Sequence, residues 1–159
     1  MESTNKACSF TGHRTIPVAH RDMVAVRLND TLVHLIEKKG VDTFIAGGAL
    51  GFDTTAALAV LSLKNVYPSI KLILAIPCEN QTKGWSDKAV ALYNDIMKKA
   101  DEVIYTGKEY TSGCMHVRNR FMVDNSEYCV AYKTRESGGT AYTYKYALEQ
   151  GKTVINIAE

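Results

Sequence analysis

The segment DTFIAGGALGFDTTAALAVL, residues 42–61, contains a short apolar run, a glycine-rich turn and a helical stretch, in that order. The same order recurs on both sides of it. The apolar runs are ACSFTG (7–12), DTFIAG (42–47), IKLILAIP (70–77), DEVIYTG (101–107), EYCVAY (127–132) and TVINIA (153–158), and the helical stretches occupy 18–39, 52–65, 85–99, 113–125 and 140–150. Six β segments that alternate with five α segments indicate a parallel sheet.

The patterns inside these segments indicate how they pack. Val24, Leu28, Leu32 and Leu35 follow the spacing of one helix face, which places an apolar stripe against a sheet. IKLILAI is almost continuously apolar, as in a strand covered on both faces, and we expect it near the centre of the sheet. We predict an α/β protein, a Rossmann-like three-layer sandwich with a mainly parallel sheet of about six strands and helices on both faces. Residues 1–159 form its single domain.

Composition limits the classes of partner. The formal net charge is only +2, so no general field draws the protein onto nucleic acid, and any anion site is local. No apolar run reaches the roughly 20 residues that span a bilayer, and MESTNKACSF lacks the pattern of a signal peptide. We expect a cytoplasmic protein without membrane contact.

The four cysteines and four histidines form no metal-ligand or disulfide pattern, so we expect no metal site.

The strongest local signal is SGGT, Ser137, Gly138, Gly139 and Thr140, which separates the strand EYCVAY from a helix. Glycines let the backbone approach an oxyanion, and the first N–H groups of a helix then bind it. This pattern predicts a phosphate site. The alternative is an ordinary loop with Thr140 as the N-cap.

Two more turns follow predicted strands. In GGALGFD, the glycines Gly47, Gly48 and Gly51 precede a helix, but they lack the GxGxxG spacing of a dinucleotide fingerprint. Asp53 favours the helix dipole there, or accepts hydrogen bonds from a ribose. In TGHR, Gly12 allows a tight bend, and His13 and Arg14 lie at the mouth of the crevice that such a sheet forms. A guanidinium at this place suits a phosphate.

The helix MHVRNRFM carries Met115, Arg118, Asn119 and Met122 on one face, at three- and four-residue spacing. We expect this face to point inward and to take Arg118 with it. An unpaired buried charge is very costly, so either an internal carboxylate, Asp53 or Glu79, or a bound ligand neutralises Arg118. Trp85, the only tryptophan, is either a packing anchor or a platform on which a base stacks.

Six motifs occur in this order along the chain: TGHR, GGALGFD, IPCENQTKGWS, KADEVIYTG, MHVRNRFMVDNSEYCVAY and SGGT. Together they resemble the YpsA-like branch of the SLOG superfamily, and the resemblance extends from about Ser9 to the C-terminus. The resemblance implies a Rossmann-like domain that binds nucleotides or nucleotide-derived molecules. Relatives among the LOG enzymes cleave a base from a nucleoside monophosphate, and DprA-like members bind single-stranded DNA.

The resemblance also bears on catalysis. LOG enzymes use an arginine in MHxRKxxM and a glutamate in PGGxGTxxE, so Arg118 takes the arginine position and is the one candidate catalytic residue, whereas Thr143 stands where the glutamate belongs. We therefore expect a protein that binds or senses a nucleotide-type ligand, such as ADP-ribose, an NAD-like molecule or a nucleotide signal, and that requires no cofactor. The alternatives are a phosphoribohydrolase of LOG type and a single-stranded nucleic-acid binder of DprA type, with nucleic acid the less favoured partner. The sequence is also compatible with a homo-oligomer.

Overall fold

The computed structural model describes residues 6–159, and within them strands and helices alternate as predicted. The strands are β1 (Lys6–Gly12), β2 (Val41–Ala46), β3 (Lys71–Ile76), β4 (Glu102–Tyr105), β5 (Tyr128–Tyr132) and β6 (Thr153–Asn156). The helices are α1 (Arg21–Lys39), preceded by a short 3-10 turn η1 (Val18–His20), then α2 (Phe52–Leu63), α3 (Asp87–Lys99), α4 (Cys114–Asp124) and α5 (Gly139–Glu149).

All six strands lie in one parallel sheet, in the order β4-β3-β2-β1-β5-β6. The chain builds the sheet outward from β1 to β4, then returns across it to place β5 on the other side of β1. The strand order therefore reverses between β1 and β5. The expectation for IKLILAI needs one correction, because β3 lies one place in from the edge and β1 and β2 hold the middle.

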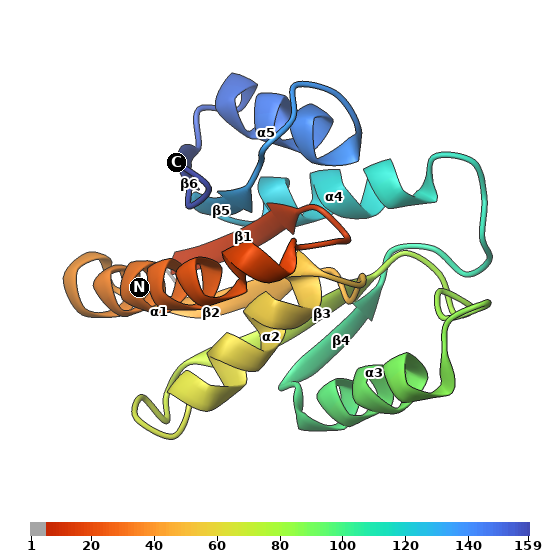
Figure 1. Ribbon diagram of the computed structural model, residues 1–159, viewed down its shortest axis with the longest axis horizontal. Coiled ribbons are helices and arrows are strands. Elements are labelled where there is room, and N and C mark those ends of the chain that lie inside the picture. Colours follow the sequence, from red (N-terminus) through yellow and green to blue (C-terminus); the bar gives the residue numbers. More distant parts are fainter. Residues whose placement is uncertain (1–5) are drawn as a thin grey trace, which may run out of the picture.

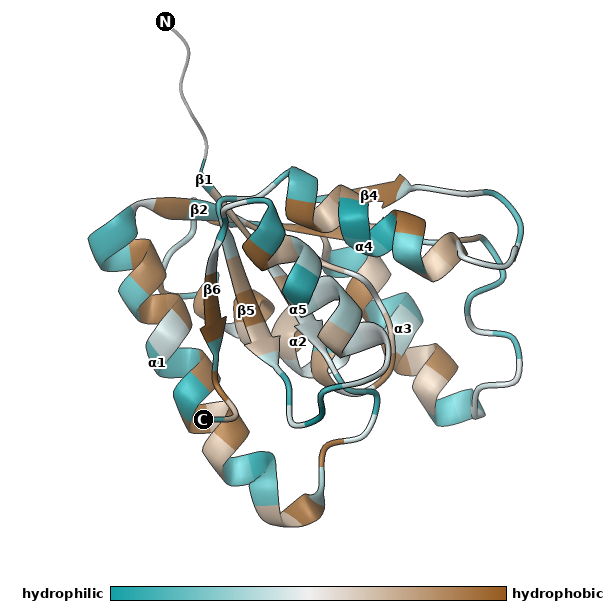
Figure 2. Ribbon diagram, turned by 90° about the horizontal axis from the view of Figure 1, so that it is seen from above, coloured by the Kyte–Doolittle hydropathy of each residue, from teal (hydrophilic) through white to brown (hydrophobic). Residues whose placement is uncertain are grey.

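Helices cover both faces of the sheet, which confirms the three-layer prediction (Figure 1). One face carries α1, α2 and α3, and the other carries α4 and α5. The stripe of Val24, Leu28, Leu32 and Leu35 is buried against the sheet. Hydropathy colouring shows how α1 alternates between hydrophilic and hydrophobic positions, as a helix with one buried face must (Figure 2).

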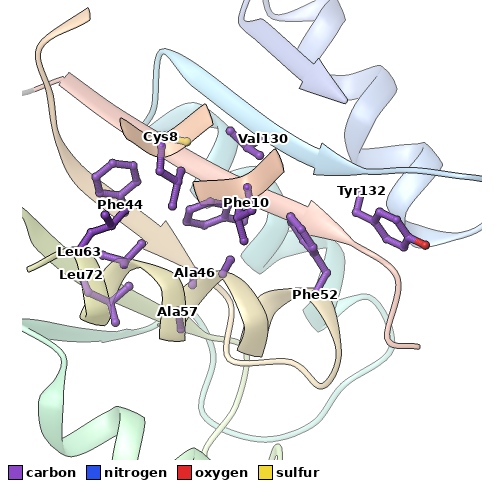
Figure 3. Packing of buried hydrophobic residues seen from close by; sticks show 14 of the residues in the cluster. Cys8, Phe10, Phe44, Ala46, Phe52, Ala57, Leu63, Leu72, Val130 and Tyr132 are labelled. Carbon is purple, nitrogen blue, oxygen red and sulfur yellow. The ribbon is translucent and has the colours of Figure 1, made fainter. Parts of the chain in front are cut away.

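The larger core cluster lies between the sheet and the layer of α1 and α2. Figure 3 shows Phe10 of β1, Phe44 of β2, Phe52 of α2 and Tyr132 of β5 within it. The Phe10 and Phe44 rings stack with centroids 6.2 Å apart, and Phe52 and Tyr132 stack at 6.0 Å. This aromatic row reaches the carboxyl ends of β1 and β5, so the core supports the sheet where its strand order reverses.

Four of the five helices start one to three residues from the expected positions, and two of these differences concern candidate site residues. Helix α3 begins at Asp87, because the Ser86 side chain accepts a hydrogen bond from the Ala89 N–H at 3.1 Å, so Trp85 precedes the helix. Helix α5 begins at Gly139 with Gly138 as N-cap, so Thr140 is its second residue and not the cap. Among residues 6–159, no helix is long and apolar enough to cross a membrane, and no His, Cys, Asp and Glu cluster could hold a metal.

Candidate functional site

A cleft of about 480 Å³ opens between the carboxyl ends of β1 and β5, where the strand order reverses. Open parallel sheets bind ligands at such a point, because the loops on either side of it diverge and leave a crevice. Four segments form its walls. They are the end of β1 and the loop after it (residues 10–15 and Pro17), the turn before α2 and its first residues (Ala49 and Asp53), one face of α4 (Met115, Arg118 and Asn119), and the segment from β5 to the start of α5 (Tyr132, Thr134, Arg135, Gly139 and Thr140).

The structure brings many of the predicted site residues together in this cleft: Gly12, His13, Arg14, Asp53, Arg118, Asn119, Gly139 and Thr140. The others lie outside its walls. Ser137 and Gly138 are on the exposed turn just before α5, and Gly47 and Gly48 are behind the cleft. Gly51 and Trp85 line a second pocket on the far side of Arg14.

The start of α5 is open to a ligand. A Cβ atom placed on Gly138 or Gly139 would meet no other atom within 4 Å, and Gly138 has a positive φ of 96°. No side chain caps the helix, and no acceptor in residues 6–159 receives the N–H of Gly139 or Thr140. These free amides, with the positive end of the helix dipole, form an arrangement that favours an anion.

The glycines of the other two turns serve internal packing instead. A Cβ on Gly12 would overlap the Phe52 ring, and one on Gly51 would overlap the backbone of Arg14. The Phe52 N–H donates to the His13 carbonyl at 3.1 Å, so the two turns are joined. Their glycines allow this close approach and do not themselves offer free backbone to a phosphate.

Arg118 is only 3% exposed, as the helix pattern predicted. Its Nη1 donates to the main-chain carbonyls of Gly47 and, at 3.3 Å, Ala75, and its Nε donates to Asn119 Oδ1 at 2.8 Å. Neither Asp53 nor Glu79 forms an ion pair with it. Its other terminal nitrogen, Nη2, contacts only the Met115 sulfur, at 3.7 Å. The acceptors for Arg118 are therefore two main-chain carbonyls and the Asn119 side-chain oxygen in place of a carboxylate, and Nη2 retains donor capacity.

Asp53 is the one carboxylate among the cleft's lining residues and is 8% exposed. Its Oδ2 accepts a hydrogen bond from the Ala49 N–H at 3.4 Å. Burial raises the pKa of Asp53, while the nearby charge of Arg118, the Ala49 N–H and Arg14 act to lower it. The Asp53 carboxylate and the Arg118 guanidinium both lie next to Gly47. A Cβ atom placed on that glycine would overlap both side chains and would lie 2.7 Å from Asp53 Oδ2.

His13 is buried between hydrogen-bond donors. Its Nε2 accepts from the Thr134 N–H at 3.0 Å, and its Nδ1 lies 3.0 Å from an Arg135 guanidinium nitrogen. A doubly protonated ring would direct N–H groups at donors on both sides. Burial, together with the charges of Arg135 and Lys133, lowers the pKa of His13. The ring is therefore neutral and holds the loop after β5 against the loop after β1.

The cleft has a local excess of positive charge, as expected for an anion site in a nearly neutral chain. Arg14, Arg118 and Arg135 line it, against the single carboxylate of Asp53. Arg14 is exposed and forms no hydrogen bond or ion pair with the described residues.

Several lining residues were not singled out from the sequence: Thr11, Thr15, Pro17, Ala49, Tyr132 and Thr134. Most of these residues lie at the carboxyl ends of β1 and β5. These lining residues could have been identified if β1 and β5 had been known to be neighbours in the sheet.

No carboxylate occupies the position within α5 that has glutamate in the LOG motif. The Thr143 hydroxyl donates to the Gly139 carbonyl at 3.1 Å, inside its own helix. Glu136 points outward, with 92% of its side chain exposed, and pairs with Lys133 at 2.7 Å.

Comparisons with known proteins identify the family of this chain. A family model described as "YspA SLOG family" matches residues 17–157. The chain is 34% identical over 138 residues to the uncharacterised SPbeta prophage-derived protein YoqJ of Bacillus subtilis, covering 77% of this chain and 81% of that protein. It is 28% identical over 152 residues to the UPF0398 protein BH1768 of Halalkalibacterium halodurans, covering 89% and 80%.

Solved structures of DNA processing protein A, DprA, share the fold. The Streptococcus pneumoniae protein superposes with a TM-score of 0.68 at 18% identity, over 94% of this chain and 49% of that one, so the chain spans about half of it. The Helicobacter pylori protein, whose structure is described with a single-stranded DNA binding mode, superposes with a TM-score of 0.65 at 17% identity. That match covers 95% of this chain and 64% of the Helicobacter pylori chain. At this identity the likeness concerns the fold alone.

Proposed function

The chain belongs to the YpsA family of SLOG proteins, and from this premise we propose that its cleft binds or senses a nucleotide or a nucleotide-derived small molecule. The phosphate lies at the start of α5, against the N–H groups of Gly139 and Thr140. The remaining donors of Arg118 and Arg14 neutralise it, and Asp53 accepts hydrogen bonds from the ribose.

The observation that carries the proposal is the open start of α5 at the point where strand order reverses. The backbone N–H groups there have no acceptor in the part of the chain that the structure describes, and no Cβ prevents an oxyanion from approaching them. The turns of β1 and β2 lack this property because their glycines are packed. A phosphate is the anion that both a helix N-terminus and a planar guanidinium suit.

Binding is favoured over cleavage. Hydrolysis of an N-glycosidic bond needs a carboxylate beside the ribose that stabilises an oxocarbenium-like transition state. Within α5, the position of the LOG glutamate holds Thr143, whose hydroxyl is used within the helix. Asp53 is the only lining residue able to substitute, and burial, which disfavours its charged form, makes it a poor stabiliser of positive charge.

Thermal unfolding with a ligand panel tests the proposal. A ligand at 100 times its Kd stabilises the native state by about 2.7 kcal/mol, which for a domain of this size raises Tm by roughly 5–10 °C. The panel contains AMP, ADP, ADP-ribose, NAD⁺ and a cyclic nucleotide. Arg14→Gln should reduce the shift, and Lys98→Gln, an equal change of charge at an exposed position on α3, should not. A flat panel, with Arg14→Gln equal to wild type, overturns the proposal.

Two further assays separate the alternatives. Release of free adenine from AMP, abolished by Asp53→Asn, would establish a phosphoribohydrolase in place of a binding protein. Retention of a labelled single-stranded oligonucleotide that weakens steeply with salt would establish a nucleic-acid binder like the DprA of Helicobacter pylori.

A further inference from the structure

A second pocket of about 530 Å³ adjoins the cleft, and Arg14 and Thr15 line both. Its remaining walls come from the starts of α1 and α2, and from Trp85 and α3. The phosphate site proposed at the start of α5 does not require it.

The second pocket is chemically unlike the cleft. Trp85 is half-buried in it, and Tyr93 holds the indole edge-on, with ring centroids 5.5 Å apart and planes at 87°. Leu92 beside it is 38% exposed, so an apolar side chain is accessible in the pocket wall. No carboxylate lines the pocket, whereas Arg14 and Arg21 do. Aromatic and apolar walls flanked by guanidinium groups suit a flat ring that is attached to an anion.

Arg14 stands between the two spaces, and its guanidinium has no hydrogen-bond or ion-pair partner among residues 6–159. Each space alone has the 300–1,000 Å³ volume that holds a drug-sized ligand. A mononucleotide fits in the cleft and leaves the second pocket empty.

We infer that the ligand has two ring-bearing halves joined through phosphates, as in a dinucleotide. One nucleoside half lies in the cleft, the linking phosphates pass Arg14, and the second ring stacks on Trp85. This inference rests on the proposed function and narrows its ligand class.

Trp85 is the only tryptophan of the chain, so its fluorescence reports on the second pocket alone. The probes are AMP, which has one base, and NAD⁺ and diadenosine diphosphate, which have two rings. The two-ring probes should quench the fluorescence and bind more tightly than AMP. Stacking of a base on an aromatic side chain corresponds to roughly 5- to 150-fold in affinity. AMP should raise Tm without quenching.

Variants locate the effect. Leu92→Glu places a carboxylate in the second pocket and should weaken the two-ring probes about tenfold or more without affecting AMP. Leu58→Glu, on α2, is the matched control, because Leu58 is 42% exposed and lines neither space. Trp85→Leu should remove the preference for two-ring probes, with AMP binding as the check that the fold is intact.

The outcomes distinguish this inference from the proposed function. If AMP itself quenches Trp85, a mononucleotide base occupies the second pocket, and the two-part ligand is wrong while nucleotide binding stands. If two-ring probes bind no better than AMP, and Leu92→Glu equals Leu58→Glu, the inference is again overturned alone. If no nucleotide alters Tm or fluorescence, the proposed function has failed with it.

Discussion

The substitution Gly139→Ala should improve the fold while impairing the site. Gly139 is the first residue of α5, it has no positive φ, and a Cβ there meets nothing within 4 Å. Alanine therefore fits without strain. It restricts the unfolded chain more than glycine does, which stabilises a protein by about 0.4–1 kcal/mol. For a domain of this size that raises Tm by roughly 1–4 °C.

The same Cβ should obstruct the ligand. Side chains on a helix tilt toward its N-terminus, so a methyl group on the first residue projects into the space where we place the phosphate. A hydrogen bond to a charged group contributes about 1.5–3 kcal/mol, so the loss of one weakens Kd by roughly 10- to 150-fold. Gly139→Val should weaken it further.

Two measurements on the same variants check this reasoning. Thermal unfolding without ligand gives the stability change, and isothermal titration with the best nucleotide of the panel gives the change in Kd. Unaltered affinity in both Gly139→Ala and Gly139→Val would refute the placement of the phosphate. A clear loss of stability in Gly139→Ala would refute the description of open space above this residue.

Three other substitutions examine the groups around the cleft. Asp53→Asn keeps a hydrogen-bond acceptor but removes the buried charge, so urea unfolding should show equal or higher stability. Calorimetry should show weaker binding of the nucleotide and unimpaired binding of pyrophosphate. Equal losses of affinity for both ligands would contradict the ribose contact. Arg118→Met leaves the buried carbonyls of Gly47 and Ala75 without a donor, and should lower the free energy of unfolding by about 2–4 kcal/mol; a fully stable variant would show that these bonds contribute little. The pKa of His13 lies below 6.5 in the native state, so the unfolded chain binds a proton first as pH falls. The difference in free energy of unfolding between wild type and His13→Gln should therefore be complete above about pH 6.5 and decline below it. A difference that does not vary between pH 7.5 and 5.5 would contradict the neutral ring.

The order of elements was predictable because each strand is short and almost wholly apolar, and each is followed by a turn and a helical pattern. Errors occurred where one hydrogen bond sets a boundary, as with Ser86 at the start of α3. The position of β3 was harder to predict, because a strand beside the edge is as apolar as one in the centre when helices cover both of its faces.

The site was predictable only as separate turns. The turns after β1, β2 and β5 each had a recognisable sequence, but strand order, which the local pattern does not contain, brings Thr134 and Arg135 beside His13. Main-chain carbonyls likewise have no signature in a sequence, so the acceptors of Arg118 were sought among carboxylates. Gly51 and Gly139 look alike in the sequence, although one packs on a backbone and the other faces open space.

The central place of β1 affects how the protein is made. The Ala7 N–H donates to the Glu127 side chain, 120 positions later, and β5 pairs along β1 from Cys8 to Gly12. At a synthesis rate of about 5–20 residues per second, one side of β1 waits roughly 6–24 s for its partner. During that time it exposes an unpaired strand edge that is open to aggregation. A nascent chain that stalls before β5 lacks the residues around the start of α5 that complete the cleft, so no ligand of the cleft can stabilise it.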